Sequence, residues 1–146
     1  MTARSSGDAL RVLADQLRAE DTPISPHVVD PAEPPTLGEL AGGGEYALVV
    51  EAVREGYLLH YGEPRLLAGH DPDLALLAGD YLYALGLDRL ATLGDDRAVA
   101  LLADLISQCA RLHAERNTEG IPDLWRSAAE RIGAGVSVTQ VTPPKQ

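Results

Sequence analysis

The chain lacks phenylalanine and is poor in lysine, cysteine and β-branched residues. Only twelve of its 146 residues are basic, with Lys145 the one lysine, against 22 aspartates and glutamates, for a formal net charge of −10. So acidic a chain is repelled by phosphate backbones and by anionic lipid surfaces, and no basic cluster in the sequence offsets that repulsion. We therefore expect neither nucleic acid nor a membrane surface as its partner.

The single cysteine and the first residues bear on the compartment of the protein. Cys109 has no second cysteine with which to form an internal disulfide, and its apolar neighbours predict a buried thiol rather than a reactive one. Residues 1–20 carry charges throughout, unlike a secretory signal. No stretch has the roughly 18–20 uncharged apolar residues that a membrane span needs. We expect a cytoplasmic protein.

Leucine and alanine dominate what the chain does contain. There are 23 leucines and 21 alanines, against 10 valines and 4 isoleucines. Leucine and alanine lose little freedom in a helix, whereas β-branched residues suit strands. The composition predicts an all-α fold and argues against an all-β sandwich.

The apolar spacing predicts a helical bundle of four to five helices with an extended proline-rich segment. The expected helices cover residues 6–20, 45–61, 72–93, 95–117 and 122–132, and a short helical turn precedes the three glycines at 42–44. The helix at 72–93 is apolar nearly all round, which is typical of a central, buried helix. In the helix at 45–61, Glu51, Arg54 and Glu55 are expected opposite the apolar face.

Local signals place the helix ends and one helix contact. Asp71 followed by Pro72 is a favourable helix start, and the helix at 72–93 is expected to end at Gly94. Gly79 and Gly86 lie seven residues apart on one stripe of that helix. A neighbouring helix is expected to approach closely there.

We divide the chain into four parts: an N-terminal helix (1–20), a proline-rich arm or linker (21–36), a helical core domain (37–133) and a flexible C-terminal tail (134–146). Five prolines between residues 21 and 36 exclude a helix or a central strand there. The tail has too little apolar surface to become ordered alone. Its valines could instead add to the surface of a partner.

The sequence holds no complete catalytic motif. The four histidines stand in separate segments, without the spacing that places two metal ligands on one helical face. There is no phosphate-binding loop, no nucleophile elbow and no pair of closely spaced cysteines. We therefore expect no metal, no cofactor and no catalysis.

Asp80 is the charged residue that the helical pattern explains least. Its neighbours one turn away on the helix include Leu76, Leu77 and Tyr83. A carboxylate among such groups faces a polar crevice, pairs with an arginine or is held uncharged. Structural pairing is the simpler interpretation, and a functional acid or ligand is the alternative.

Part of the sequence resembles the trans-polyprenyl diphosphate synthases. The resemblance rests on LLAGDYL at 76–82, LATLGD at 90–95, and the turn HYGEPR at 60–65, whose proline precedes Asp80 by 16 residues. The similarity covers residues 45–118, about half of this chain. It implies an α-helical core of the same kind.

The departures from that family concern its catalytic residues. An ungapped comparison places Val49 and Val50 where the family has the aspartates of its first Mg²⁺-binding motif. His60 and Tyr61 replace the basic pair of the turn, and the second aspartate-rich motif has no counterpart. Without clustered carboxylates and basic residues, nothing neutralises a diphosphate leaving group. No catalytic residue of the family carries over.

Bacterial heterodimeric polyprenyl synthases pair a catalytic subunit with a small helical subunit that lacks these motifs. The resemblance implies a similar role here: a non-catalytic accessory or scaffold subunit that binds a protein partner, or a second copy of itself. Aromatic side chains are enriched at such interfaces. The candidate contact residues are Tyr57, Tyr61, Tyr81, Tyr83 and Trp125.

Two alternatives accompany this interpretation. Tyr57 and Trp125 are equally well explained by burial in the protein's own core. The alternative function is that of a binding protein or enzyme for a small apolar, isoprenoid-like ligand, with His60 and Asp80 at the mouth of a groove between the helices.

Overall fold

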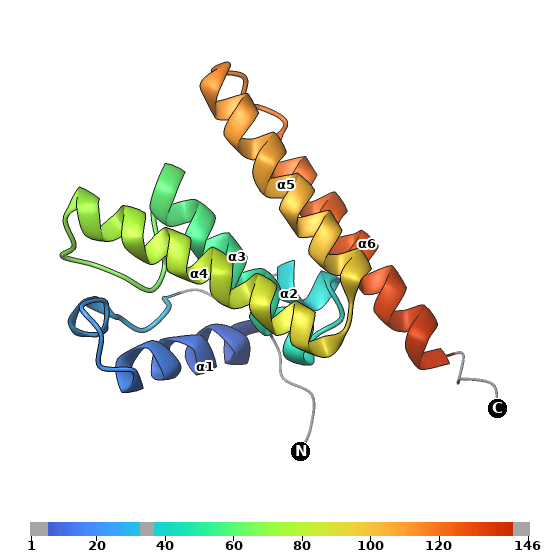
Figure 1. Cartoon of the computed structure of the whole chain (residues 1–146), viewed down its shortest axis with the longest axis horizontal. Helices are drawn as coiled ribbons and strands as arrows, with labels where there is room; N and C mark the ends of the chain where they lie inside the picture. Colours follow the sequence, from blue (N-terminus) through green and yellow to red (C-terminus); the bar gives the residue numbers. More distant parts are fainter. Residues whose placement is uncertain (1–5, 33–36, 142–146) are drawn as a thin grey trace.

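A computed structural model describes residues 6–32 and 37–141 of the chain, with side chains described from Ala9 to Val136. These residues form six α-helices and no β-strand, which confirms the all-α prediction (Figure 1). The helices are α1 (Ser6–Ala19), α2 (Leu37–Leu40), α3 (Gly44–Tyr61), α4 (Pro72–Leu93), α5 (Asp96–Ala114) and α6 (Ile121–Val141).

The count exceeds the expected four to five because α2 is a helix of its own. Gly42, Gly43 and Gly44 follow it at φ angles of 112°, 70° and 56°, a region that favours glycine. This turn separates the four residues of α2 from α3.

The predicted start and end of α4 are confirmed. α4 begins at Pro72, and the Asp71 side chain accepts a hydrogen bond from the Leu74 amide at 2.8 Å. It ends at Gly94, whose φ of 78° is left-handed. Asp95 caps α5 in the same way, accepting from the Ala98 amide at 3.0 Å. These boundaries depend on groups adjacent in sequence.

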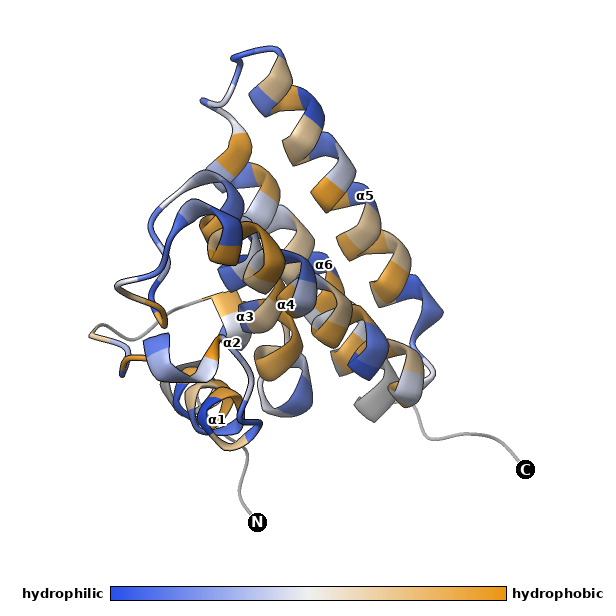
Figure 2. Ribbon diagram, turned by 60° about the vertical axis from the view of Figure 1, so that its left-hand side comes forward, coloured by the Kyte–Doolittle hydropathy of each residue, from blue (hydrophilic) through white to orange (hydrophobic). Residues whose placement is uncertain are grey.

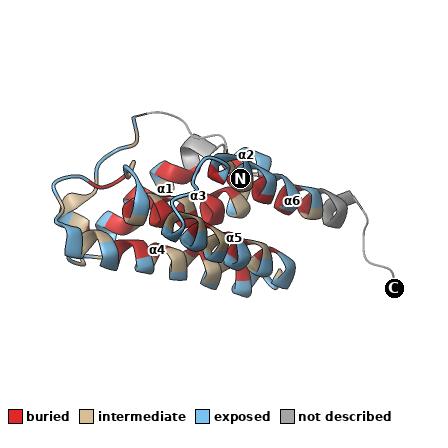
Figure 3. Cartoon of the chain, turned by 90° about the horizontal axis from the view of Figure 1, so that it is seen from above, coloured by how far each residue is buried: buried red, intermediate tan, exposed pale blue. Residues whose placement is uncertain are grey.

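The central helix is α3, not α4 as the sequence predicted. Most of α3 is buried, including both of its inner glutamates, and Figure 3 shows it red in the middle of the bundle. α4 buries only one side of itself and leaves Leu76 and Leu77 exposed. The apolar residues all round α4 therefore do not bury the whole helix, and some of them form an exposed apolar surface.

α3 and α4 pack closely at glycines, as the sequence predicted for Gly79 and Gly86. A Cβ atom on Gly79 would overlap the ring of His60, and one on Gly86 would lie 2.5 Å from Cγ2 of Val53. A Cβ on Gly56 of α3 would lie 2.8 Å from both the Gly79 carbonyl oxygen and the Tyr83 ring. Small residues from both helices thus allow the two backbones to approach.

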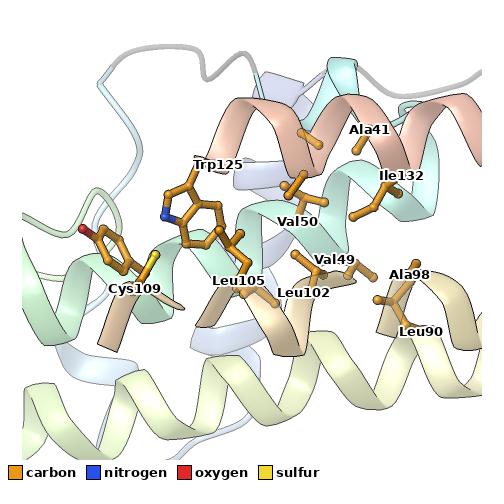
Figure 4. Packing of buried hydrophobic residues seen from close by; sticks show 14 of the residues in the cluster. Ala41, Val49, Val50, Leu90, Ala98, Leu102, Leu105, Cys109, Trp125 and Ile132 are labelled. Atoms are coloured by element: carbon orange, nitrogen blue, oxygen red, sulfur yellow. The ribbon is translucent and has the colours of Figure 1, made fainter. Parts of the chain in front are cut away.

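The apolar core consists of two clusters on different sides of α3. The larger cluster gathers side chains of α3, α4, α5 and α6, and Figure 4 shows Val49 and Val50 packed among them. It includes Cys109, which is buried as expected. The smaller cluster holds Leu10, Leu13 and Leu17 of α1 against the opposite side of α3. Figure 2 shows apolar residues concentrated where the helices meet.

Residues 21–32, the described part of the proline-rich segment, lie against another loop of the same chain. A short 3₁₀ turn at Ser25–His27 leads to Val28, which forms an isolated antiparallel bridge with Leu67. The Val29 amide also donates to the Leu66 carbonyl at 2.7 Å. Pro34 and Pro35 lie outside the described residues.

α6 continues to Val141, so the prediction that the last helix ends at Ile132 was wrong. Gly133 lies against the Leu40 carbonyl, and Val136 is buried against Gly42. α2 and its glycine turn thus give α6 a surface to pack on that its own sequence does not reveal. Residues 142–146 of the expected tail lie outside the described residues.

No helix in residues 6–32 and 37–141 is both long enough and apolar enough to span a lipid bilayer.

Candidate functional site

Six aromatic and imidazole side chains gather at the C-terminal end of α3. They come from four helices, so only the tertiary fold brings them together. We call this set the aromatic cluster: Tyr57, His60, Tyr61, Tyr83, His113 and Trp125.

Tyr57 is the centre of the aromatic cluster. Its ring centroid lies 5.3 Å from those of Tyr61 and Trp125. Its hydroxyl and Nε2 of His113 share a hydrogen bond of 2.8 Å. Burial raises the pKa of the Tyr57 hydroxyl. Tyr57 and Trp125 are both buried, so they belong to the protein's own core.

The aromatic cluster reaches the surface at Tyr61. The Tyr61 ring stacks on His113, with the centroids 4.0 Å apart and the planes 6° from parallel. Tyr61 is 41% exposed, so the aromatic cluster is open to solvent on the side where Tyr61 lies. A surface ring held this way is fixed in orientation before any partner arrives.

His60 connects the aromatic cluster to α4. Its ring lies on Gly79 and meets the edge of Tyr83, with the centroids 5.1 Å apart and the planes at 88°. Nε2 of His60 lies 3.3 Å from the Leu76 carbonyl oxygen and 3.3 Å from Oδ1 of Asp80. Burial raises the pKa of Tyr83, which packs against His60. Asp80 thus has a histidine beside it, and its side chain is 74% exposed.

Two leucines on α4 extend this region as an apolar surface. Leu76 is 57% exposed and Leu77 is 66% exposed, although large apolar side chains usually turn inward. The Leu76 carbonyl and Asp80 both contact His60, which neighbours Tyr61. We call the region formed by His60, Tyr61, Leu76, Leu77 and Asp80 the α3–α4 surface.

Tyr81 lies away from the aromatic cluster. Its hydroxyl donates to Oε1 of Glu20 at 2.7 Å and so ties α4 to the end of α1. Burial and this carboxylate raise the pKa of Tyr81 to about 12. The structure therefore brings together four of the five aromatic candidates, together with His60 and Asp80, and separates Tyr81 from them.

A buried charge network that the sequence did not reveal lies further along α3. Glu51 and Glu55 are fully buried, although they were expected on the outer face of the helix. Arg65 joins them, with Nη1 2.7 Å from Oε1 of Glu51 and Nε 2.9 Å from Oε1 of Glu55. Amides of Gly38, Arg65 and Leu66 donate to the remaining carboxylate oxygens. The network joins α2, α3 and the loop before α4.

Arg54 stands between that network and the aromatic cluster. Its guanidinium carbon lies 5.3 Å from the centre of the Tyr57 ring and 5.0 Å from that of Trp125, within the range of a cation–π contact. Burial lowers the pKa of Arg54, and the nearby positive charge of Arg65 lowers it further. One feature of the sequence could have indicated the buried network: two glutamates stand four residues apart, with Arg54 beside them, in the otherwise apolar stretch 46–59.

Two pockets in the structure lie away from the α3–α4 surface. One, of about 230 Å³, is lined by Tyr46, Leu93, Gly94, Asp95, Arg97 and Gly135. The other, of about 50 Å³, lies between α5 and α6. Neither contains His60 or Asp80, the residues expected at the mouth of a ligand groove.

Within the described part of the chain, no three histidine, cysteine, aspartate or glutamate side chains are grouped so as to hold a metal ion. Comparisons of the chain with protein-family models, with curated proteins and with solved structures find no match.

Proposed function

We propose that this protein is a non-catalytic accessory or scaffold subunit that binds a partner protein through the α3–α4 surface. The observation that carries the proposal is the exposure of Leu76, Leu77 and Tyr61 around the His60–Asp80 pair. Covering water-exposed apolar side chains with a partner lowers the free energy of the complex. The aromatic cluster holds Tyr61 in place, so Tyr61 loses little conformational entropy when a partner binds.

The resemblance to polyprenyl diphosphate synthases supports a synthase-like enzyme as the partner. It covers residues 45–118, which include α3, α4 and α5, and so include every residue of the α3–α4 surface. The proline-rich segment and the C-terminal end of the chain are proposed as further contacts. Self-association through the same surface is the competing form of this function.

The alternative function is that of a binding protein or enzyme for a small apolar ligand. It needs an apolar pocket beside His60 and Asp80, and the two pockets described above lie elsewhere.

The proposal is tested by affinity purification of the tagged chain from its native cell, followed by a measurement of mass by light scattering. We expect a stoichiometric partner that is lost when Leu76 and Leu77 are both replaced by serine. Leu93→Ser is the matched control, because Leu93 is 44% exposed at the far end of the same helix. A monomeric mass with no stoichiometric partner would contradict the proposal.

A further inference from the structure

We infer that the α3–α4 surface binds a basic amphipathic helix of the partner protein, seated along α4 over Leu76 and Leu77. This inference rests on the proposed function and specifies the chemistry of the partner.

Six exposed residues of α4 form a stripe along one side of the helix. Apart from the adjacent pair Leu76 and Leu77, its members follow one another at intervals of three or four residues, which keeps them on one helical face. The stripe consists of Asp73, Leu76, Leu77, Asp80, Ala84 and Asp88, all exposed. Its length is about 22 Å at roughly 1.5 Å per residue. Four turns of a partner helix would cover it.

The charges on this stripe are all negative. Between Arg65 and Arg89 the sequence has no arginine or lysine. Other exposed carboxylates have arginine partners, as in the pairs of Arg18 with Asp30 and Arg126 with Asp123. Among the residues that the structure describes, no arginine pairs with a carboxylate of this stripe.

Charge complementarity therefore favours one occupant. A helix with leucine-like side chains in its centre and lysine or arginine on its flanks would cover the two leucines and neutralise the aspartates beside them. A second copy of this chain would bring a net charge of −10 and place like carboxylates opposite one another. An anionic membrane would be repelled for the same reason.

Two side chains of α3 beside the stripe are held by contacts with their neighbours. His60 is held by Gly79, by the Tyr83 ring and by two polar contacts to α4. Tyr61 is stacked on His113. The partner helix would thus meet side chains already in place, with Tyr61 at one edge of the seat.

The probe for this inference is a fluorescently labelled 18-residue synthetic peptide of leucine and lysine with helical amphipathic spacing. Its control peptide has the same length and leucine positions, with glutamate in place of every lysine. Anisotropy titrations against the full chain should show binding of the lysine peptide only. Replacing Leu76 and Leu77 by serine should weaken binding by about tenfold or more, since two apolar contacts are lost. Asp73→Asn together with Asp80→Asn should weaken binding and flatten its salt dependence.

Two matched variants separate docking on α4 from general attraction to an acidic protein. Leu93→Ser removes an exposed leucine outside the stripe, and Glu119→Gln with Glu130→Gln removes two exposed charges outside it. Both should leave the affinity unchanged, and thermal unfolding should show that every variant is folded. Equal losses in the control variants, or no binding of the lysine peptide, would overturn the inference.

Two further outcomes separate this inference from the proposed function. If the chain forms a dimer that the Leu76 and Leu77 substitutions abolish, the surface binds a second copy of the chain, and the inference of a basic partner helix is wrong. If a stoichiometric partner is retained by the Asp73 and Asp80 variants and the peptide does not bind, the accessory function stands and the basic helix is again wrong. If the lysine peptide binds as expected but no cellular partner is found, the surface stands and the accessory function fails.

Discussion

Arg65 is the cation that pairs with the two buried glutamates of α3. It contributes its side chain and its backbone amide to two carboxylates that have no contact with solvent. A buried carboxylate that loses its partner keeps the cost of its desolvation. Glu51 also accepts a hydrogen bond from the Gly38 amide at the start of α2. Loss of Arg65 would therefore destabilise α2 as well as α3.

We expect Arg65→Ala to lower the free energy of unfolding by about 3–5 kcal/mol, because it removes the ion-pair partner of two buried carboxylates. Urea denaturation followed by circular dichroism measures the change. The matched control is Arg126→Ala, which breaks an exposed pair with Asp123 and should cost about 0–1 kcal/mol. A cost for Arg65→Ala no larger than that of the control would show that solvent reaches the two glutamates.

The burial of a residue could be predicted from the sequence where its own helix determines it, but not where a distant partner does. Cys109 was expected to be buried because its own helix has a clear apolar face, and it is buried. Glu51 and Glu55 were expected outside because charge normally faces water. Their partner Arg65 lies ten or more residues away in a loop, and no helical periodicity reveals such a partner.

Among the helices, boundaries set by local groups could be predicted, whereas those set by distant contacts could not. The start and end of α4 follow from Asp71, Pro72 and Gly94, and all three act where expected. The length of α6 depends on α2, which lies some ninety residues earlier in the chain. The sequence of residues 133–141 alone therefore indicated a tail.

The candidate site follows the same rule. Tyr81 and Tyr83 are two residues apart, so they point about 200° apart around α4 at roughly 100° per residue. One joins the aromatic cluster and the other reaches Glu20 on the opposite side. Sequence alone selected both as contact residues, because the rotation of α4 about its axis is set by its packing on α3.

We expect Gly133→Ala to destabilise the fold by about 1–3 kcal/mol, the usual cost of overpacking. The added methyl group would overlap the backbone carbonyl of Leu40, which cannot rotate away, so α2 and α6 must separate. The matched control is Gly135→Ala on the same helix, where the atoms nearest to the added methyl group belong to the flexible end of the Arg97 side chain. The midpoints of thermal unfolding of the two variants give the comparison, and an equal effect would contradict the assigned contact of α6 with α2.

At the scale of the whole molecule, α3 is shared by both apolar clusters. Val49, Val50 and Val53 belong to the larger cluster, while Leu48 and Ala52 belong to the smaller one. Neither cluster can lose its contacts without exposing a side of the same helix. The two clusters should therefore unfold together, although α1 and the α5–α6 pair lie on different sides of the molecule (Figure 1).

This coupling can be measured because Trp125, the sole tryptophan, lies in the larger cluster. Leu13→Ala removes apolar contacts only from the smaller cluster and should lower the free energy of unfolding by about 2–5 kcal/mol. If unfolding is cooperative, the fluorescence of Trp125 and the far-ultraviolet circular dichroism shift to the same urea midpoint in this variant. Leu77→Ala, at an exposed position, should move neither signal by more than about 0.5 kcal/mol. If circular dichroism is lost in Leu13→Ala while the Trp125 signal keeps its original midpoint, α1 unfolds separately and α3 does not couple the two clusters.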